Sequence, residues 1–217
     1  SAPQTFTWQR KGDAPIDGLP LPSLKRFNRL DDLTIVGFAI TDPSCIMGNA
    51  SVRSISLKEL PHLASLNGLS DLPNVQQLKF NQCPALCSLE GVSEIPSLTE
   101  MHVENCELIT DFTFLRHLPL LTKFNRHWDS GGINLSKCGV FTNIEFLSGL
   151  KSAPAIDLNL QGSVNLSVFN QLKATKILNF HVDTFKLDLS PLRHVEELQL
   201  YQIYDLDGDM QRDLNDE

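Results

Sequence analysis

Apolar residues in this chain recur with a fixed period, and the pattern is clearest between residues 75 and 121. A shift of 23 positions places the apolar residues Val75, Leu78, Phe80 and Cys83 on Leu98, Met101, Val103 and Cys106. Within each repeat, apolar and polar residues first alternate, which is the period of a strand with one buried face. Apolar residues then occupy every third position, which suits tight 3₁₀ turns better than a long α-helix. A period of this length predicts a solenoid with one strand and one return arm per coil.

The same pattern predicts about eight coils between residues 24 and 203, within one domain over residues 1–217. The apolar strand positions expected in successive coils are Leu30, Leu33 and Ile35; Val52, Ile55 and Leu57; Val75, Leu78 and Phe80; Leu98, Met101 and Val103; Ala155, Leu158 and Leu160; Ile177, Phe180 and Val182; and Val195, Leu198 and Leu200. In residues 1–23, Phe6 and Trp8 alternate with polar residues, so we expect an N-terminal cap. The acidic stretch 204–217 is expected to cap the other end.

One coil interrupts the period. Leu121 opens it, but a later core position falls on Arg126, and burying an unpaired Arg is costly. The pattern resumes at Ile133, and the next coil is expected to begin at Ala155. We therefore expect one long coil with an insertion at 125–132, because about 11 extra residues are too few to build another coil. Insertions in solenoids form loops, often at the binding face.

These repeats resemble the leucine-rich repeat family, in which L-x-x-L-x-L is followed by a position that many members fill with Asn or Cys. Here Cys83, Cys106 and Cys138 occupy that position. The period and the short arms resemble the internalin-like and phosphatase-regulator-like classes. The resemblance implies an α/β-type solenoid, a right-handed horseshoe with a parallel concave β-sheet and convex 3₁₀ turns and loops. It also implies that the concave face and the adjoining loops bind another protein.

Composition excludes several classes of partner. Acidic residues outnumber basic ones, 26 to 18, and the net charge of -8 argues against nucleic acid. The chain has no apolar run long enough to predict a membrane span, and its beginning lacks the apolar core of a signal peptide. The repeated cysteines are expected to be buried free thiols rather than zinc ligands, which suggests a reducing, cytoplasmic location. No cofactor is expected. The stretch 205–209 is a weak match to a calcium loop, and the N-x-S triplets at Asn49, Asn134 and Asn165 are attributed to chance.

Polar residues between the core positions are expected to line the concave sheet, since strand side chains alternate faces. One column is expected to run through Thr34, Ser56, Lys79, His102, Asn134, Asn159, His181 and Gln199. A second is expected to run through Val36, Lys58, Asn81, Glu104, Ser136, Gln161, Asp183 and Tyr201. The candidate partner-binding residues on these strands are Lys79, His102, Glu104, Lys123 and Tyr201.

The insertion supplies three more candidates, Arg126, His127 and Trp128. Trp and Arg are enriched among the residues that dominate binding energies at protein interfaces. The alternative is that Trp128 folds back and covers the interrupted coil.

His102 with Glu104, and His181 with Asp183, have the spacing of a general base and its orienting carboxylate. The two histidines are expected about 14 Å apart, too far to share a proton or a metal. We therefore predict no catalytic residues and a non-catalytic protein-interaction module. The alternatives are the recognition arm of a larger enzyme or effector, for example of the ubiquitin-ligase type, and an extracellular adhesion module.

Overall fold

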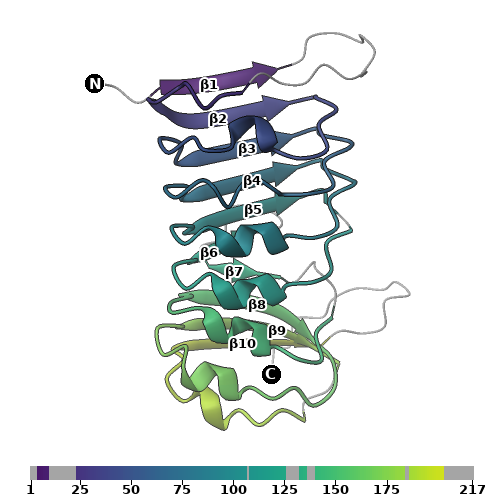
Figure 1. Ribbon diagram of the computed structural model, residues 1–217. Helices are drawn as coiled ribbons and strands as arrows, with labels where there is room; N and C mark the ends of the chain where they lie inside the picture. Colours follow the sequence, from purple (N-terminus) through teal and green to yellow (C-terminus); the bar gives the residue numbers. More distant parts are fainter. Residues whose placement is uncertain are drawn as a thin grey trace.

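Ten strands form one parallel sheet in which each strand lies beside the next in sequence (Figure 1). The computed structural model describes residues 4–9, 23–106, 108–125, 132–135, 140–183 and 186–202. The strands are β1 (Gln4–Gln9), β2 (Leu30–Val36), β3 (Ser54–Lys58), β4 (Gln77–Asn81), β5 (Glu100–Glu104), β6 (Lys123–Asn125), β7 (Ile133–Asn134), β8 (Ala155–Leu160), β9 (Ile177–Val182) and β10 (Glu197–Gln202).

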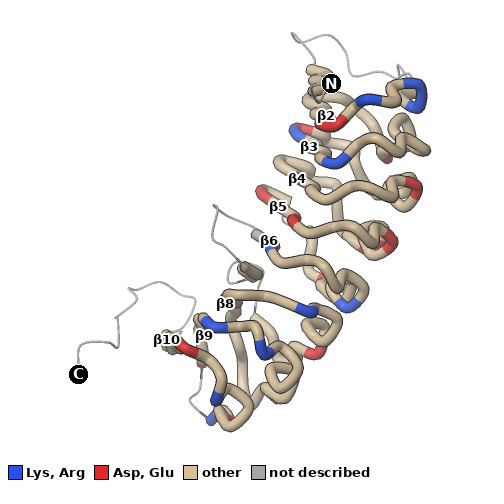
Figure 2. The backbone as a smooth tube through the Cα atoms, turned by 90° about the vertical axis from the view of Figure 1, so that its left-hand side faces the viewer, with Lys and Arg blue, Asp and Glu red and all other residues tan. Residues whose placement is uncertain are grey.

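Short 3₁₀ helices form the return arms, as the three-residue spacing of apolar positions predicts. They are η1 (Ser44–Ile46), η2 (Glu90–Glu94), η3 (Thr113–His117), η4 (Glu145–Gly149), η5 (Ser167–Asn170) and η6 (Ser190–Leu192). Figure 2 shows the chain as an arc with the strands along its inner side and the arms along its outer side. The predicted solenoid with a concave sheet is confirmed.

A continuous apolar core lies between the sheet and the arms. Each coil contributes the apolar residues on the core-facing side of its strand; in β4, for example, Leu78 is 0 % and Phe80 1 % exposed. Leu78 pairs in register with Ile55 of β3 and with Met101 of β5, so each core side chain packs against the coils on both sides. Burial of these apolar side chains holds the stack together, at about 1.5–3 kcal/mol for each large side chain.

Aromatic side chains cover the N-terminal end of the core. Phe6 and Trp8 of β1 lie edge to face with ring centroids 5.8 Å apart, and both pack against the buried cluster. Phe6 also contacts Phe27, and Trp8 contacts Phe38, at centroid distances of 5.7 Å. The alternation of Phe6 and Trp8 with polar residues therefore corresponds to a strand that places both rings over the end of the first coil.

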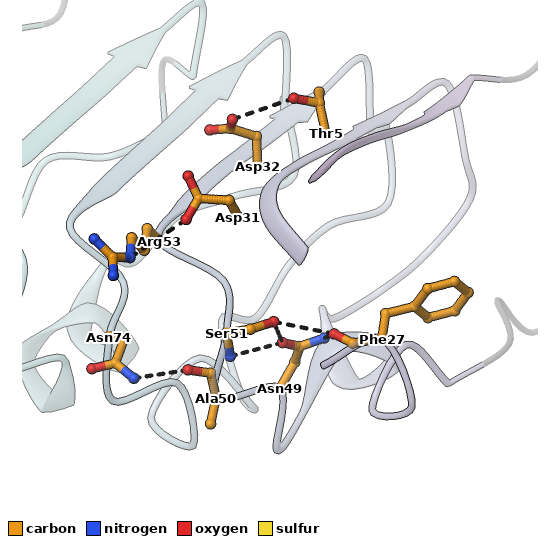
Figure 3. Close-up of polar contacts among 9 residues, drawn as sticks. All are labelled: Thr5, Phe27, Asp31, Asp32, Asn49, Ala50, Ser51, Arg53 and Asn74. Atoms are coloured by element: carbon orange, nitrogen blue, oxygen red, sulfur yellow. Dashed lines mark hydrogen bonds and ion pairs between the residues drawn. The ribbon is translucent and has the colours of Figure 1, made fainter. Parts of the chain in front are cut away.

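Polar contacts join the first two coils where the chain leads into β2 and β3 (Figure 3). The Asn49 side chain is 2 % exposed, and its Nδ2 donates to the backbone oxygens of Leu24 at 2.9 Å and Phe27 at 3.1 Å. Its Oδ1 accepts a hydrogen bond from the backbone N–H of Ser51 at 3.1 Å. The amide of the N-x-S triplet at Asn49 is thus a buried structural group, and glycosylation would require the coil to open.

Most arms begin with the same local turn. A side-chain oxygen accepts a hydrogen bond from the backbone N–H two residues later, at 2.7–3.2 Å. The residues that supply this oxygen are Asp42, Ser65, Ser88, Asp111, Asn143, Asn165 and Asp188. Asp, Asn and Ser favour this turn because their short side chains reach the nearby backbone. Each turn directs the chain away from the sheet and into the arm.

The interrupted coil differs from the prediction. The segment around Phe124 and the segment around Ile133 are not one strand with a loop inside it; they form β6 and β7, which pair in parallel with Phe124 opposite Ile133. β7 then pairs with β8. The extra residues therefore add a short strand to the sheet, and the next 3₁₀ arm, η4, follows β7. The expectation of a single strand here was wrong, because a strand of two residues needs far fewer residues than a complete coil.

The register of the last coils also differs from the prediction by two residues. β8 buries Ile156, Leu158 and Leu160, and Leu158 lies opposite Phe180 of β9, as expected. Leu200 of β10, however, also lies opposite Phe180 rather than opposite Val182. The first core positions of these coils are thus Ala153 and Thr175, both 0 % exposed, in place of Ala155 and Ile177. A shift of two keeps the same residues on the buried face, so alternation alone cannot detect it.

Candidate functional site

The concave face is the solvent side of the sheet. It is formed by the residues of β2 to β10 at positions that face away from the core, which we call inward because they line the inner side of the arc. One row lies in register across it: Thr34, Ser56, Lys79, His102, Asn125, Asn134, Asp157, Asn179 and Gln199. A second row runs through Val36, Lys58, Asn81 and Glu104 in β2–β5, and through Asn159, His181 and Tyr201 in β8–β10. His181 and Tyr201 are therefore neighbours in one row, and Asp157 rather than Asn159 follows Asn134.

Glu100 is the centre of a hydrogen-bonded cluster in the middle of this face. Its Oε1 lies 2.7 Å from His102 Nε2 and 3.8 Å from Lys123 Nζ, and its Oε2 accepts from Gln77 Nε2 at 3.3 Å. The Glu100 side chain is 19 % exposed and that of His102 is 22 %. We call Gln77, Glu100, His102 and Lys123 the central cluster. It brings together two predicted contact residues, His102 and Lys123, around a carboxylate that was not among the predictions.

The remaining predicted residues of the middle strands lie beside the central cluster. Glu104 is exposed, and its Oε2 accepts from Asn81 Nδ2 at 2.5 Å. Lys79 is exposed on β4, as is Lys58 on β3, and neither has an ion-pair partner among the residues that the structure describes. This half of the face therefore presents two uncompensated cations to solvent.

A second cluster lies at the C-terminal end of the face. The rings of His181 and Tyr201 stack with centroids 4.8 Å apart and an interplanar angle of 18°. His181 Nε2 lies 3.4 Å from Asp157 Oδ1, and Asp157 Oδ2 accepts from Asn134 Nδ2 at 3.4 Å. Gln199 accepts a short hydrogen bond from the Tyr201 hydroxyl. We call His181, Tyr201, Asp157 and Gln199 the C-terminal cluster; of these residues, only Tyr201 was predicted as a contact.

Neither predicted histidine–carboxylate pair exists as expected. His102 contacts Glu100 rather than Glu104, and His181 contacts Asp157, whereas Asp183 accepts a hydrogen bond from the backbone N–H of Gly162 at 2.8 Å. The additional strand β7 places β5 and β9 four strand steps apart, or about 19 Å at the usual strand spacing. Over the described part of the chain, no group of three or more His, Cys, Asp or Glu side chains is placed to hold a metal ion.

Arg126, His127 and Trp128 lie outside the described residues, so their contribution stays a prediction. The structure does describe the end of this segment at Gly132. Its backbone oxygen accepts from the N–H of Phe124 at 2.9 Å, and its φ is +116°. A Cβ built there would lie 2.2 Å from the backbone oxygen of Ala155. Only glycine fits at this point, where the chain enters β7 against β8.

The repeated cysteines lie in the core, as predicted for the two that the structure describes. Cys83 and Cys106 are both 0 % exposed, and Cys106 Sγ lies 3.3 Å from the backbone oxygen of Glu104. A hydrogen bond with Cys106, together with burial, raises the pKa of the Cys83 thiol well above its ordinary value. Cys138 lies outside the described residues. Thiols in this state are packing groups and poor nucleophiles or metal ligands.

Glu100 and Asp157 were expected on the concave sheet from the sequence, but they were not selected as contact residues or as partners of the histidines, although a detectable signal exists. Each lies at an inward strand position, and each contacts a histidine either two residues away on its own strand or on the neighbouring strand. The expected pairs join each histidine to the carboxylate two residues after it, whereas Glu100 lies two residues before His102. Asp157 lies on the strand next to that of His181, so a pairing restricted to one strand omitted it as well.

Comparison with known proteins defines the fold. No protein-family model matches the chain, and no curated protein matches it in sequence. Among solved structures, an internalin (inlF) from Listeria monocytogenes superposes with a TM-score of 0.55 at 16 % sequence identity, over 83 % of this chain and 52 % of that one. The chain thus spans about half the length of that internalin. No helix in the described parts of the chain is both long and apolar enough for a membrane span. The ten-stranded parallel sheet with 3₁₀ arms is an internalin-like leucine-rich-repeat solenoid.

Proposed function

We propose that this chain is a non-catalytic interaction module that binds another protein through its concave face and the insertion at 125–132. The observation that carries the proposal is the state of the polar side chains on the middle strands. Glu100 contacts His102 and Gln77 by hydrogen bonds and Lys123 by an ion pair, and these side chains remain partly open to solvent. A surface whose side chains are already ordered loses less conformational entropy when it binds.

Charge on the face supports a protein partner with polar and acidic contacts in the middle region. Lys58 and Lys79 are exposed and lack ion-pair partners among the described residues. Exposed cations accelerate association with a partner of opposite charge and make the rate sensitive to salt. The net charge of -8 disfavours a polyanion as the partner. The proposal places the chain in a reducing compartment, in keeping with the two buried free thiols.

The insertion is proposed to supply the main apolar anchor, Trp128, next to Arg126. Packing alone would preserve the period of the repeat, whereas this chain interrupts it once, with a Trp, an Arg and a glycine turn. A central aromatic anchor contributes about 2 kcal/mol or more to binding. Trp128→Ala is therefore expected to weaken binding by at least that amount and to leave the melting temperature nearly unchanged.

The experiment compares Trp128→Ala with Trp8→Ala, which removes a tryptophan from the N-terminal cap. Each variant is immobilised, exposed to extract of the source cell, and analysed by quantitative mass spectrometry and by thermal unfolding. Trp8 packs against Phe38 and the core, so its loss should lower stability and preserve the captured partner. If Trp128→Ala lowers stability and retains the partner, Trp128 covers the interrupted coil and the proposed anchor is wrong.

A further inference from the structure

The concave face of β8–β10 has a composition unlike that of the middle strands. Its inward residues are Ala155, Asp157, Asn159, Ile177, Asn179, His181, Glu197, Gln199 and Tyr201, with no Lys or Arg among them. Asp157 and Glu197 supply negative charge, whereas β3 and β4 present Lys58 and Lys79. The C-terminal end of the face therefore has acidic residues without the lysines of β3 and β4, and it is complementary to a cation.

The stacked rings of His181 and Tyr201 form an aromatic platform at this end, in which the two facing surfaces cover each other and the outer ring faces are left for a further planar group. The two residues lie opposite one another on β9 and β10, and both side chains are partly exposed on the concave side. Asp157 Oδ1 on β8 lies 3.4 Å from His181 Nε2, and Gln199 accepts a hydrogen bond from the Tyr201 hydroxyl. These contacts and the stacking favour this arrangement of the two rings before any ligand arrives. An aromatic face of this kind attracts a cationic group, and the attraction increases as the site is desolvated.

Three hydrogen-bond acceptors lie on the strands of the platform and on the neighbouring β8. Asn179 Oδ1 is buried, and no donor within the described residues reaches it. Asp157 Oδ1 is also buried; it lies 3.4 Å from His181 Nε2 and accepts no hydrogen bond from the described residues. Glu197 is exposed, and its Oε1 accepts only from Gln199 Nε2 among the described residues, at 2.6 Å. A buried acceptor without a donor is unfavourable, so a ligand that donates several N–H groups would relieve the deficit.

We propose that this end of the concave face binds an arginine-bearing segment of the protein partner, with the guanidinium against the His181–Tyr201 platform and Asp157 and Glu197 as its counter-charges. The inference rests on the proposed function, since it identifies the chemistry of the partner at one part of the same face. Arginine fits better than lysine because its planar guanidinium stacks on aromatic rings and donates in a fixed fork to carboxylates.

The test uses the whole chain, labelled with ¹⁵N, and four capped pentapeptides as probes: Gly-Arg-Gly-Arg-Gly and its matched versions with lysine, citrulline or glutamate in place of arginine. Amide shifts are followed during titration at low salt. The arginine peptide is expected to shift resonances of β8–β10 preferentially. The citrulline peptide, which keeps the shape and loses the charge, is expected to bind at least about fivefold more weakly. Equal shifts with citrulline or glutamate would overturn the proposal, and tighter binding of the lysine peptide would overturn the choice of arginine.

Variants separate this site from general attraction to an acidic protein. Asp157→Asn and Tyr201→Leu are each expected to weaken binding of the arginine peptide about threefold to tenfold, with spectra that remain dispersed. Asp32→Asn is the matched control, because it removes one inward carboxylate from β2, at the opposite end of the same sheet. Asp32→Asn is expected to leave the affinity unchanged. If all three variants weaken binding equally, the attraction comes from net charge and the site does not exist.

A last comparison distinguishes failure of this inference from failure of the proposed function. The partner captured by the wild-type chain is tested against Asp157→Asn and against Lys79→Ala. Loss of binding in Lys79→Ala with full binding in Asp157→Asn would refute the arginine site and retain the concave face as the interface. Full binding in both variants would refute the concave face itself.

Discussion

Leu78→Ala tests the packing on which the whole solenoid depends. Leu78 is fully buried in β4 and lies in register between Ile55 and Met101. Both neighbours are fixed by the hydrogen bonds of their own strands, so the cavity left by the truncation cannot collapse. Core Leu→Ala substitutions cost about 2–5 kcal/mol, the larger values arising where the cavity persists. We expect a loss in the upper part of that range, about 3–5 kcal/mol.

Leu198→Ala is the matched control for Leu78→Ala, because Leu198 occupies the equivalent position in β10. It lies opposite Leu178 and is 36 % exposed, and no described strand covers its other side. Less buried surface and one packed neighbour in place of two should reduce the cost to about 1–2 kcal/mol.

Urea denaturation followed by circular dichroism and by fluorescence measures both losses. Coincident transitions from the two probes are required, because arrays of repeats can unfold in stages. A loss below about 1 kcal/mol for Leu78→Ala, or one no larger than that of Leu198→Ala, would show that Leu78 does not lie between two packed coils.

Three further predictions concern other parts of the chain. Cys83 and Cys106 are expected to react with a maleimide only after unfolding, as read by mass spectrometry, because both are buried and the pKa of the Cys83 thiol is raised. Gly132→Ala is expected to lower stability by about 2 kcal/mol or more, since its Cβ would overlap a backbone oxygen of β8. The pKa of the Asp42 carboxyl is lowered below its ordinary 3.8, mainly by a hydrogen bond with the Ser44 side chain and also by one from the Ser44 backbone N–H. The resulting stabilisation is present at neutral pH and is lost as the pH falls through the folded-state pKa, so Asp42→Asn should flatten the decline in stability below about pH 4.

Each of these predictions has its own control. Cys87 is exposed, so it should react in the native state and show that the reagent is active. Gly162 also has a positive φ, but nothing lies within 4 Å of a Cβ built there, and Gly162→Ala should cost less than Gly132→Ala. An equal cost would show that the contact with β8 is absent. An unchanged acid profile in Asp42→Asn would show that the hydrogen bonds from Ser44 do not perturb this carboxylate in solution.

The fold could be predicted from the sequence because two periods coexist in each repeat. The alternation around Leu78 and Phe80 predicts a strand, and the three-residue spacing after Cys83 predicts a 3₁₀ arm. Both follow from which positions face the core. The burial of the Cys83 and Cys106 thiols could be predicted in the same way, because their position in the repeat faces the core.

The register of β8 and β9 could not be obtained from apolar alternation, which is unchanged by a shift of two residues. The turns that begin the arms contain the missing information. Asn143 and Asn165 each lie ten positions before the first core residue of their coil, at Ala153 and Thr175. Thr175 is polar, and a search for apolar residues passes over it. Local hydrogen-bonding residues therefore fix a register that hydrophobicity leaves open.

Of the two clusters on the concave face, only the C-terminal cluster depended on that register. The central cluster lies in the regular part of the array, and its members follow directly from strand pairing between Glu100 and Lys123. The C-terminal cluster requires His181 opposite Tyr201, which the shifted register excluded. β7 was missed for a different reason, because a strand of two residues is too short to show a period. Its presence increases the distance between the two histidines.

Site-specific photo-crosslinking tests most directly whether the concave face binds the partner. Benzoylphenylalanine replaces Lys79 on the concave side of β4 in one variant and Glu94 on the convex η2 in the other; both positions are exposed. The variants are irradiated in extract of the source cell, and the crosslinked proteins are identified by mass spectrometry. We expect one protein to be crosslinked from position 79 and not from position 94. A partner crosslinked from position 94 and not from position 79 would contradict this expectation, and would place the interface on the convex arms.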